Sequence, residues 1–274
     1  GVVTMKDALA VAKLKSSGLT ALDAAALGIT CLDGPQVARL CPKFQALRSL
    51  RFDYHDHKKK PLPDWPKAPP FYRLRYLETP KGFDALVVDK QQRYTQLPDT
   101  APVPYLPLNF NWASITDDTT KPIIITEGEL KAAKACKEGF PTIGLGGVYS
   151  WKSCKIGLTF LPALEVFNWL RRYVYICFDS DLKSNVMVSS ALRDLAEEFH
   201  RRGAFPRLVS LPTLKDLDKV GLDDFLVHAG GNAADRPHET VRTGPPQHPR
   251  ARKLGERPQG IGHRPVDTGV NADV

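Results

Sequence analysis

The chain has 274 residues, of which 42% are hydrophobic and 25% are charged, and its formal net charge is +8. This composition is that of an ordinary globular protein, and it excludes wholesale disorder, a collagen-like fibre and a coiled-coil rod. The longest apolar runs, such as residues 174–178, fall far short of the roughly 20 residues of a membrane helix. No basic-then-apolar leader opens the sequence, so we expect no membrane partner.

Residues 1–50 are predicted to form a small helical unit. Apolar residues recur at helical spacing over residues 8–14, 22–27 and 37–47, and the last run is interrupted by Pro42. Nothing in this unit indicates catalysis.

Residues 51–120 change in character, because ten prolines fall between residues 61 and 107. Strand-like pieces remain at residues 71–77 and 85–88. Since proline is excluded from central strands, we expect an irregular β region with edge strands and loops.

Residues 121–232 have the most regular pattern, in which apolar strands alternate with helical segments. The predicted strands are residues 123–126, 142–145, 173–178 and 207–211, and the predicted helices are residues 129–138, 160–170, 188–199 and 221–228. The near-continuous apolar run at 173–178 is typical of a parallel strand that is covered on both faces. This alternation predicts a doubly wound α/β domain.

Residues 233–274 form a basic segment rich in proline, glycine and arginine, without an aromatic residue. Such a segment cannot bury enough apolar area to fold, so we expect a disordered tail.

The cysteine pattern indicates a cellular compartment for the protein, and its net charge indicates a class of binding partner. None of the five cysteines forms a C-x-x-C pair, which disfavours a zinc ribbon or a disulfide framework and favours a reducing cytoplasm. The positive charge favours a polyanionic partner, although many basic proteins bind no nucleic acid.

Carboxylates follow three of the predicted strands. Glu127 ends the first strand, Asp179 and Asp181 follow the third, and Asp223 and Asp224 come after the fourth. Because ligands of an open parallel sheet bind beyond the carboxyl ends of its strands, we expect these side chains at one edge. Clustered carboxylates repel one another, and a divalent cation with oxygen ligands, Mg²⁺ or Mn²⁺, removes that cost.

Each acidic pair taken alone is also explained as a helix cap or as acids that complement a helix dipole, whereas the joint pattern favours a metal site. Gly128 would allow a tight turn after Glu127. Lys131 and Lys183 lie close to the carboxylates in sequence, where either would contact a phosphate or offset negative charge.

Three motifs resemble those of the Toprim domain, which is shared by bacterial-type primases, topoisomerases and some nucleases. They are residues 123–128 (Ile-Ile-Ile-Thr-Glu-Gly), 143–148 (Ile-Gly-Leu-Gly-Gly-Val) and 175–181 (Tyr-Ile-Cys-Phe-Asp-Ser-Asp). The sequence is most similar to the Toprim-like domain of phage and plasmid primase-helicase polypeptides. Three further stretches support this likeness, namely residues 14–19, 70–76 and 219–226, so that the resemblance covers roughly residues 10–230.

The resemblance implies a compact parallel sheet flanked by helices and a role for each acidic residue. Glu127 would be a metal ligand or a general acid and base, and Asp179 and Asp181 would hold Mg²⁺. Asp223 or Asp224 would supply the later acidic residue of the site.

The sequence departs from the family pattern in three respects. The family's later stretch usually reads Lys-Gly-x-Asp-Asp, whereas Val220 here separates Lys219, the expected phosphate-binding lysine, from Gly221. The cysteine pairs of a primase zinc module and a Walker A motif are both absent from the sequence. A replicative helicase would therefore be a fused or separate partner.

The resemblance implies a Mg²⁺-dependent module of a phage or plasmid replication protein, with primase-type nucleotidyl transfer as the favoured reaction. Its partners would be single-stranded DNA and nucleotides. A Toprim nuclease, or an inactive domain that binds nucleic acid or docks a helicase, are the alternatives, since polymerisation and hydrolysis use the same metal-held carboxylates. A surface of basic residues would hold the backbone of the template. The alternative is that these arginines only contact solvent. They are Arg73, Arg75, Arg171, Arg172, Arg201 and Arg202.

Overall fold

The computed structural model describes residues 5–62, 70–78, 93–98, 100–179, 186–212, 214, 217 and 219–232. All of them belong to the first of two units into which the chain divides, Gly1–Asp235. The strand expected at residues 85–88 and the tail expected at residues 233–274 lie outside the described residues.

The chain begins with three short helices that are capped by polar side chains. The third starts earlier than expected, because the carboxylate of Asp33 accepts a hydrogen bond from the Gln36 backbone while the Gln36 side chain accepts one from the Asp33 backbone. It ends before Pro42, which cannot continue a helix. The helices are α1 (Ala8–Ser16), α2 (Ala21–Leu27) and α3 (Gly34–Leu40).

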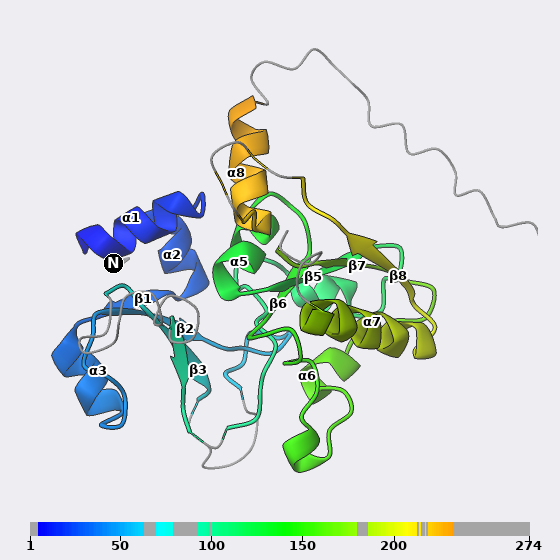
Figure 1. The fold of residues 1–274 in the computed structure, drawn as a ribbon, viewed down its shortest axis with the longest axis horizontal. Helices are drawn as coiled ribbons and strands as arrows, with labels where there is room; N and C mark the ends of the chain where they lie inside the picture. The colour runs from blue at the N-terminus through cyan, green and yellow to red at the C-terminus, as the bar shows by residue number, and fades with distance from the viewer. Residues whose placement is uncertain are drawn as a thin grey trace, which may run out of the picture. The chain divides into compact units, whose positions relative to one another are not determined.

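The proline-rich region contributes to a regular antiparallel sheet rather than to isolated strands. Its order is β1-β2-β3-β4, and β1 of the expected helical unit pairs with β2, so the sheet crosses the boundary expected near residue 50. Both faces of β3 are covered. One face packs against α3, and the other carries Arg73, whose side chain contacts α5 (Figure 1). The strands are β1 (Thr30–Leu32), β2 (Ser49–Asp53), β3 (Tyr72–Tyr76) and β4 (Tyr94–Gln96).

The second sheet is parallel throughout and has helices on both faces, which confirms the α/β class. Its order is β6-β5-β7-β8. Its strands are β5 (Ile123–Glu127), β6 (Thr142–Leu145), β7 (Tyr173–Cys177) and β8 (Phe205–Val209). The flanking helices are α5 (Glu129–Lys137), α6 (Pro162–Glu165), α7 (Val186–Arg201) and α8 (Leu222–Asn232).

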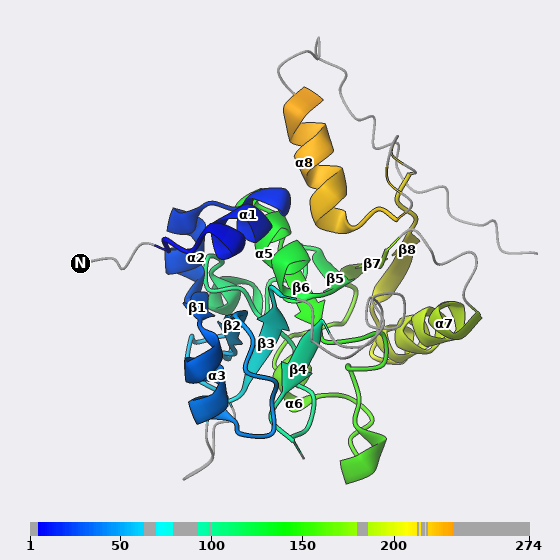
Figure 2. The ribbon, with the colours of Figure 1, turned by 60° about the vertical axis from the view of Figure 1, so that its left-hand side comes forward.

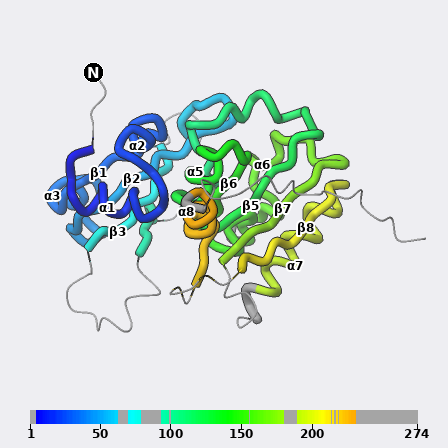
Figure 3. The backbone as a smooth tube through the Cα atoms, turned by 90° about the horizontal axis from the view of Figure 1, so that it is seen from above, coloured from blue at the N-terminus to red at the C-terminus, as the bar shows by residue number. Residues whose placement is uncertain are grey.

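Alternation along β5 divides the core between the two faces of the parallel sheet. Ile123 and Ile125 pack in the large aromatic-rich cluster with residues of α6 and α7, such as Phe199. Ile124 points the opposite way, toward the cluster that contains Val220 and residues of α5 and α8. Viewed from above, α8 lies beside α5 (Figure 3).

Two further elements, in the region of the parallel sheet, differ clearly from the prediction. The helix expected at residues 160–170 shrinks to α6, because Phe167 and Trp169 turn into the core and the Trp169 indole donates a hydrogen bond to the Leu164 carbonyl at 2.9 Å. The last strand lies two residues earlier than expected, since its pairing with β7 begins at Phe205.

α5 is the helix around which the two sheets meet. Leu130, Ala132 and Ala133 share a core with α1, α2 and β2, whereas Ala135 and Cys136 face the two cores of the parallel sheet. The small side chains of this helix let several elements approach it at once, and Figure 2 shows α1 and α2 next to it. None of the helices in the described part of the chain has the length and hydropathy required to span a bilayer.

Arg172 does not belong to a basic surface, contrary to the expectation, because its side chain is fully buried. Its guanidinium donates hydrogen bonds of 2.7–3.1 Å to the backbone carbonyls of Ile115, Thr116, Lys121 and Asn168. It therefore ties the segment before β5 to the turn before β7.

Replacing this arginine is expected to destabilise the fold. Arg172→Met leaves buried carbonyls without donors and should lower the free energy of unfolding by about 3 kcal/mol. Arg201→Met is the control, because the Arg201 side chain is 69% exposed and its loss should cost about 0.5 kcal/mol or less. Urea unfolding measures both, and equal losses would contradict this role for Arg172.

Candidate functional site at the carboxyl edge of the parallel sheet

The order of the parallel sheet reverses between β5 and β7. The chain passes from β5 to β6 on one side and then returns to place β7 and β8 on the other side. In open α/β sheets this switch point is where ligands bind, beyond the carboxyl ends of the strands. Glu127 is the last residue of β5 and is half-buried, and Asp179 follows β7 by two residues and is buried.

Gly128 makes the sharp turn from β5 into α5. Its φ of +102° lies in the left-handed region that side chains disfavour. The next turn contains Glu129 and Lys131, which lie two residues apart and hence about 200° apart around the helix axis. The two charged side chains leave the same turn in opposite directions, one toward each sheet.

Lys131 points to the carboxyl edge of the parallel sheet. Its ammonium group lies 2.5 Å from Oδ1 of Asp179, and the Lys219 ammonium lies 3.2 Å from Oδ2 of the same carboxylate. The Lys131 side chain is 20% exposed and that of Lys219 is 50% exposed. Two of the expected phosphate-binding lysines therefore hold one of the expected metal ligands.

Asp223 approaches the same lysine from α8. A methyl group on Gly221 would lie 2.7 Å from Cε of Lys131 and 2.9 Å from Oδ1 of Asp223, so both side chains flank this glycine. Burial lowers the pKa of Lys131, but Asp179, Asp223 and Glu127 outweigh it, and the pKa is raised above its usual value. Three carboxylates from separate elements thus act on one ammonium group.

Asp224, the next residue of α8, caps the start of this helix. Its carboxylate accepts a hydrogen bond of 2.9 Å from the Gly221 backbone at the start of α8. Burial and the charge of Asp223 raise the pKa of Asp224, although this hydrogen bond opposes them. Of the two expected acidic residues, Asp224 caps a helix, and the charges of both residues interact with Lys131.

Asp181 and Lys183 lie outside the described residues, so their expected roles stay predictions. Among the described residues, no three His, Cys, Asp or Glu side chains are placed to share a metal ion. The carboxylates nevertheless fit a cation in charge and in donor chemistry, because Asp179 already binds the ammonium of Lys131, and the charges of Asp223 and Glu127 also act on it.

Arg73 was expected to contact nucleic acid, but it is buried in an ion pair. Its guanidinium lies 2.7 Å from Oε1 of Glu129, whose side chain is 1% exposed, and the Tyr54 hydroxyl donates to the same oxygen at 2.6 Å. Burial lowers the pKa of Arg73, but Glu129 outweighs it and raises the pKa overall. This pair joins β3 to the first turn of α5.

Arg75 lies on the same face of β3, near Tyr94 and α1. Its guanidinium is 5.7 Å from the centre of the Tyr94 ring. Burial and the charges of Arg75 and Arg93 lower the pKa of Lys13, although Asp223 and its neighbour on α8 act against them. Lys13 therefore feels positive charge from β3 and negative charge from the start of α8.

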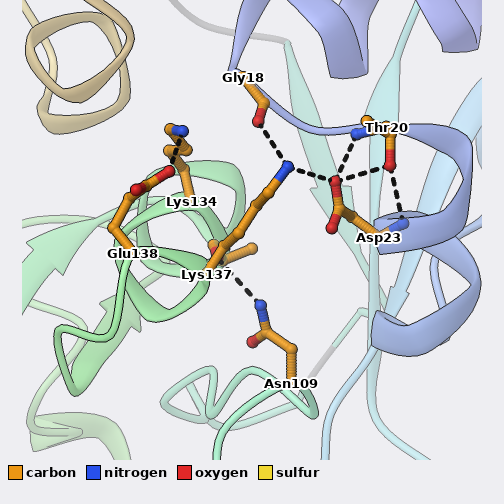
Figure 4. Close-up of polar contacts among 8 residues, drawn as sticks. Gly18, Thr20, Asp23, Asn109, Lys134, Lys137 and Glu138 are labelled. Atoms are coloured by element: carbon orange, nitrogen blue, oxygen red, sulfur yellow. Dashed lines mark hydrogen bonds and ion pairs between the residues drawn. The ribbon is translucent and has the colours of Figure 1, made fainter. Parts of the chain in front are cut away.

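The far end of α5 is anchored separately. The Lys137 ammonium lies 2.8 Å from Oδ2 of Asp23, a residue that also receives the Thr20 backbone hydrogen bond in the cap of α2 (Figure 4). Lys134 and Glu138 form a second pair on the same helix. These lysines face α2 and the helix end rather than the carboxylates of the strand edge.

Sequence reasoning missed Glu129 and Tyr54. Glu129 follows Glu127 and Gly128 directly, where the dipole of a helix explains an acid without a buried partner. The available signal was arginine at positions 73 and 75 of a strand that otherwise carries only tyrosine and leucine. Such arginines on a covered strand need buried partners.

Comparisons with known proteins provide similarity without a function. Residues 111–233 match a family model described as a domain of unknown function, DUF3854. An uncharacterized protein of Picosynechococcus sp. is 29% identical over an alignment of 133 residues, and the match covers 44% of this chain. The matched region spans 13% of the length of that protein. No solved structure matches the chain.

A double-mutant cycle tests the buried ion pair. Arg73→Met and Glu129→Gln each leave a buried charge unpaired and should each cost about 3 to 5 kcal/mol in urea unfolding. Together they should cost less than the sum by about 2 kcal/mol or more. The control pair, Lys152 and Asp194, is 3.8 Å apart and partly exposed, so its coupling should stay below about 1 kcal/mol. Additive losses for Arg73 and Glu129 would refute the coupling.

Proposed function

We propose that this chain is a Mg²⁺-dependent nucleic-acid-processing module of a phage or plasmid replication protein. The proposed reaction is primase-type nucleotidyl transfer on single-stranded DNA in the cytoplasm. One observation carries this proposal: the buried carboxylate of Asp179, just after β7, binds a cation, the Lys131 ammonium, at the switch point of a parallel sheet whose neighbouring strand β5 ends in Glu127. The strand order and the place of these residues support the Toprim resemblance of the sequence.

The chemistry follows from the residues at this edge. A bound divalent ion would supply charge stabilisation for phosphoryl transfer. Glu127 and Asp179 would hold it from neighbouring strands, with Asp181 as a further ligand. Lys219 is half exposed while it contacts Asp179, so it can turn toward a nucleotide phosphate. Lys13 and Arg75 would offer positive charge to the template backbone.

One structural feature favours the non-catalytic alternative, a Toprim-like domain that binds nucleic acid or docks a helicase. Both oxygens of Asp179 are paired with lysines. A charge-balanced cluster of this kind is stable without a metal ion, so activity has to be measured directly.

The test pairs a primer-synthesis assay with a nicking assay. The chain is incubated with radiolabelled nucleotides, single-stranded DNA and Mg²⁺, and in parallel with supercoiled plasmid. Asp179→Asn should lower primer synthesis by about a hundredfold or more, because it removes a charged ligand of the divalent ion that would stabilise the reacting phosphate. Asp194→Asn, on α7 with a side chain that is 44% exposed, should leave it unchanged.

Each other outcome selects an alternative. If the protein nicks the plasmid but makes no primers, and Asp179→Asn abolishes the nicking, the result would favour the nuclease. Binding of single-stranded DNA without either activity, unchanged in Asp179→Asn, would favour the inactive domain.

A further inference from the structure

The cation at the carboxyl edge of the parallel sheet is a side chain of the protein itself. We propose that Lys131 is a resident counter-ion that competes with the divalent ion for Asp179 and thereby sets the metal affinity of the site. This inference rests on the proposed function, because the divalent ion is the cofactor of that function.

Competition follows from the geometry at Asp179. An ammonium group 2.5 Å from Oδ1 uses the oxygen that a divalent ion would need, and a second ammonium group is 3.2 Å from Oδ2. The two lysines differ in how easily they can leave. The Lys219 side chain is half exposed, so water screens its pair and can replace it. Lys131 is largely buried, and its pair with Asp179 is the more persistent one.

The fold also provides room for Lys131. Gly221, at the start of α8, has no side chain where a methyl group would lie 2.7 Å from Cε of Lys131. The lysine stem therefore passes between α5 and α8, beside Asp223. Departure of Lys131 from this position would leave Asp179 and Asp223 buried without their nearest positive charge, which is costly.

A second oxygen donor at this edge lacks a partner. Thr126 is fully buried, and its hydroxyl has no hydrogen-bond partner within the described part of the chain. Side chains alternate along a strand, so Thr126 shares with Ile124 the face that α5 and α8 cover. This hydroxyl, next in sequence to Glu127, is an unused oxygen donor, and oxygen donors are the ligands that Mg²⁺ and Mn²⁺ take.

The experiment measures metal binding rather than activity. The full chain is titrated with Mn²⁺, and the free ion is followed by its electron paramagnetic resonance signal. Lys131→Met should bind Mn²⁺ about tenfold tighter or more than the unchanged protein, because a competing buried charge is gone. Adding Asp179→Asn to this variant should abolish the gain.

Lys137→Met is the matched control, since Lys137 is an ion-paired lysine of the same helix that faces Asp23 (Figure 4). It should bind Mn²⁺ as the unchanged protein does. Equal or weaker binding by Lys131→Met overturns the proposal, as does an equal gain in Lys137→Met.

Folding of the variant is a second measurement. Lys131→Met should melt at a lower temperature without metal and should recover on addition of Mn²⁺, because the ion replaces the lost charge. If the variant is unfolded without metal, circular dichroism should show refolding during the titration. A chain that stays unfolded with Mn²⁺ overturns the proposal.

The two proposals fail separately. Tighter Mn²⁺ binding in Lys131→Met, without primer synthesis by any variant, supports the role of Lys131 and overturns the primase assignment. Primer synthesis by the unchanged protein, without a gain in Mn²⁺ affinity in Lys131→Met, supports the primase assignment and overturns the role of Lys131.

Discussion

The first turn of α5 buries two charged side chains, and each needs a partner of opposite charge. These partners come from the two sheets and fix the position of α5 beside the candidate site. Glu129 forms an ion pair with Arg73 of β3 and accepts a hydrogen bond from Tyr54, which follows β2. Lys131 forms an ion pair with Asp179, at the end of the parallel strand β7. A buried charge without a partner destabilises a protein by several kcal/mol. The two sheets are therefore tied to one helix turn, in addition to the apolar contacts that α5 makes along its length.

The same turn connects structure to chemistry. Gly128 turns the chain so that Glu127 stays at the sheet edge while Lys131 reaches back toward Asp179. The charge of Asp179 is then offset by an internal cation, the Lys131 ammonium group 2.5 Å away. The protein's own side chains therefore balance this part of the acidic edge.

The basic residues show how strongly burial changes the meaning of a charge. The sequence offers many arginines as a surface for nucleic acid, yet Arg73 pairs with Glu129 and Arg172 donates to backbone carbonyls in the interior. Arg171, Arg201 and Arg207, in contrast, are exposed. Burial therefore separates arginines that stabilise the interior from those that water or a polyanion can reach.

The sequence by itself determined the α/β class, the positions of the parallel strands and most helices, and the placing of Glu127 and Asp179 at strand ends. These features depend on local periodicity and on turn residues, which neighbouring residues encode. The three-dimensional fold was needed to show that Arg73 binds Glu129, that Lys131 and Lys219 bind Asp179, and that Asp224 caps a helix. Such pairings join residues far apart in the chain, and their partners follow from strand order and burial, which local patterns do not contain.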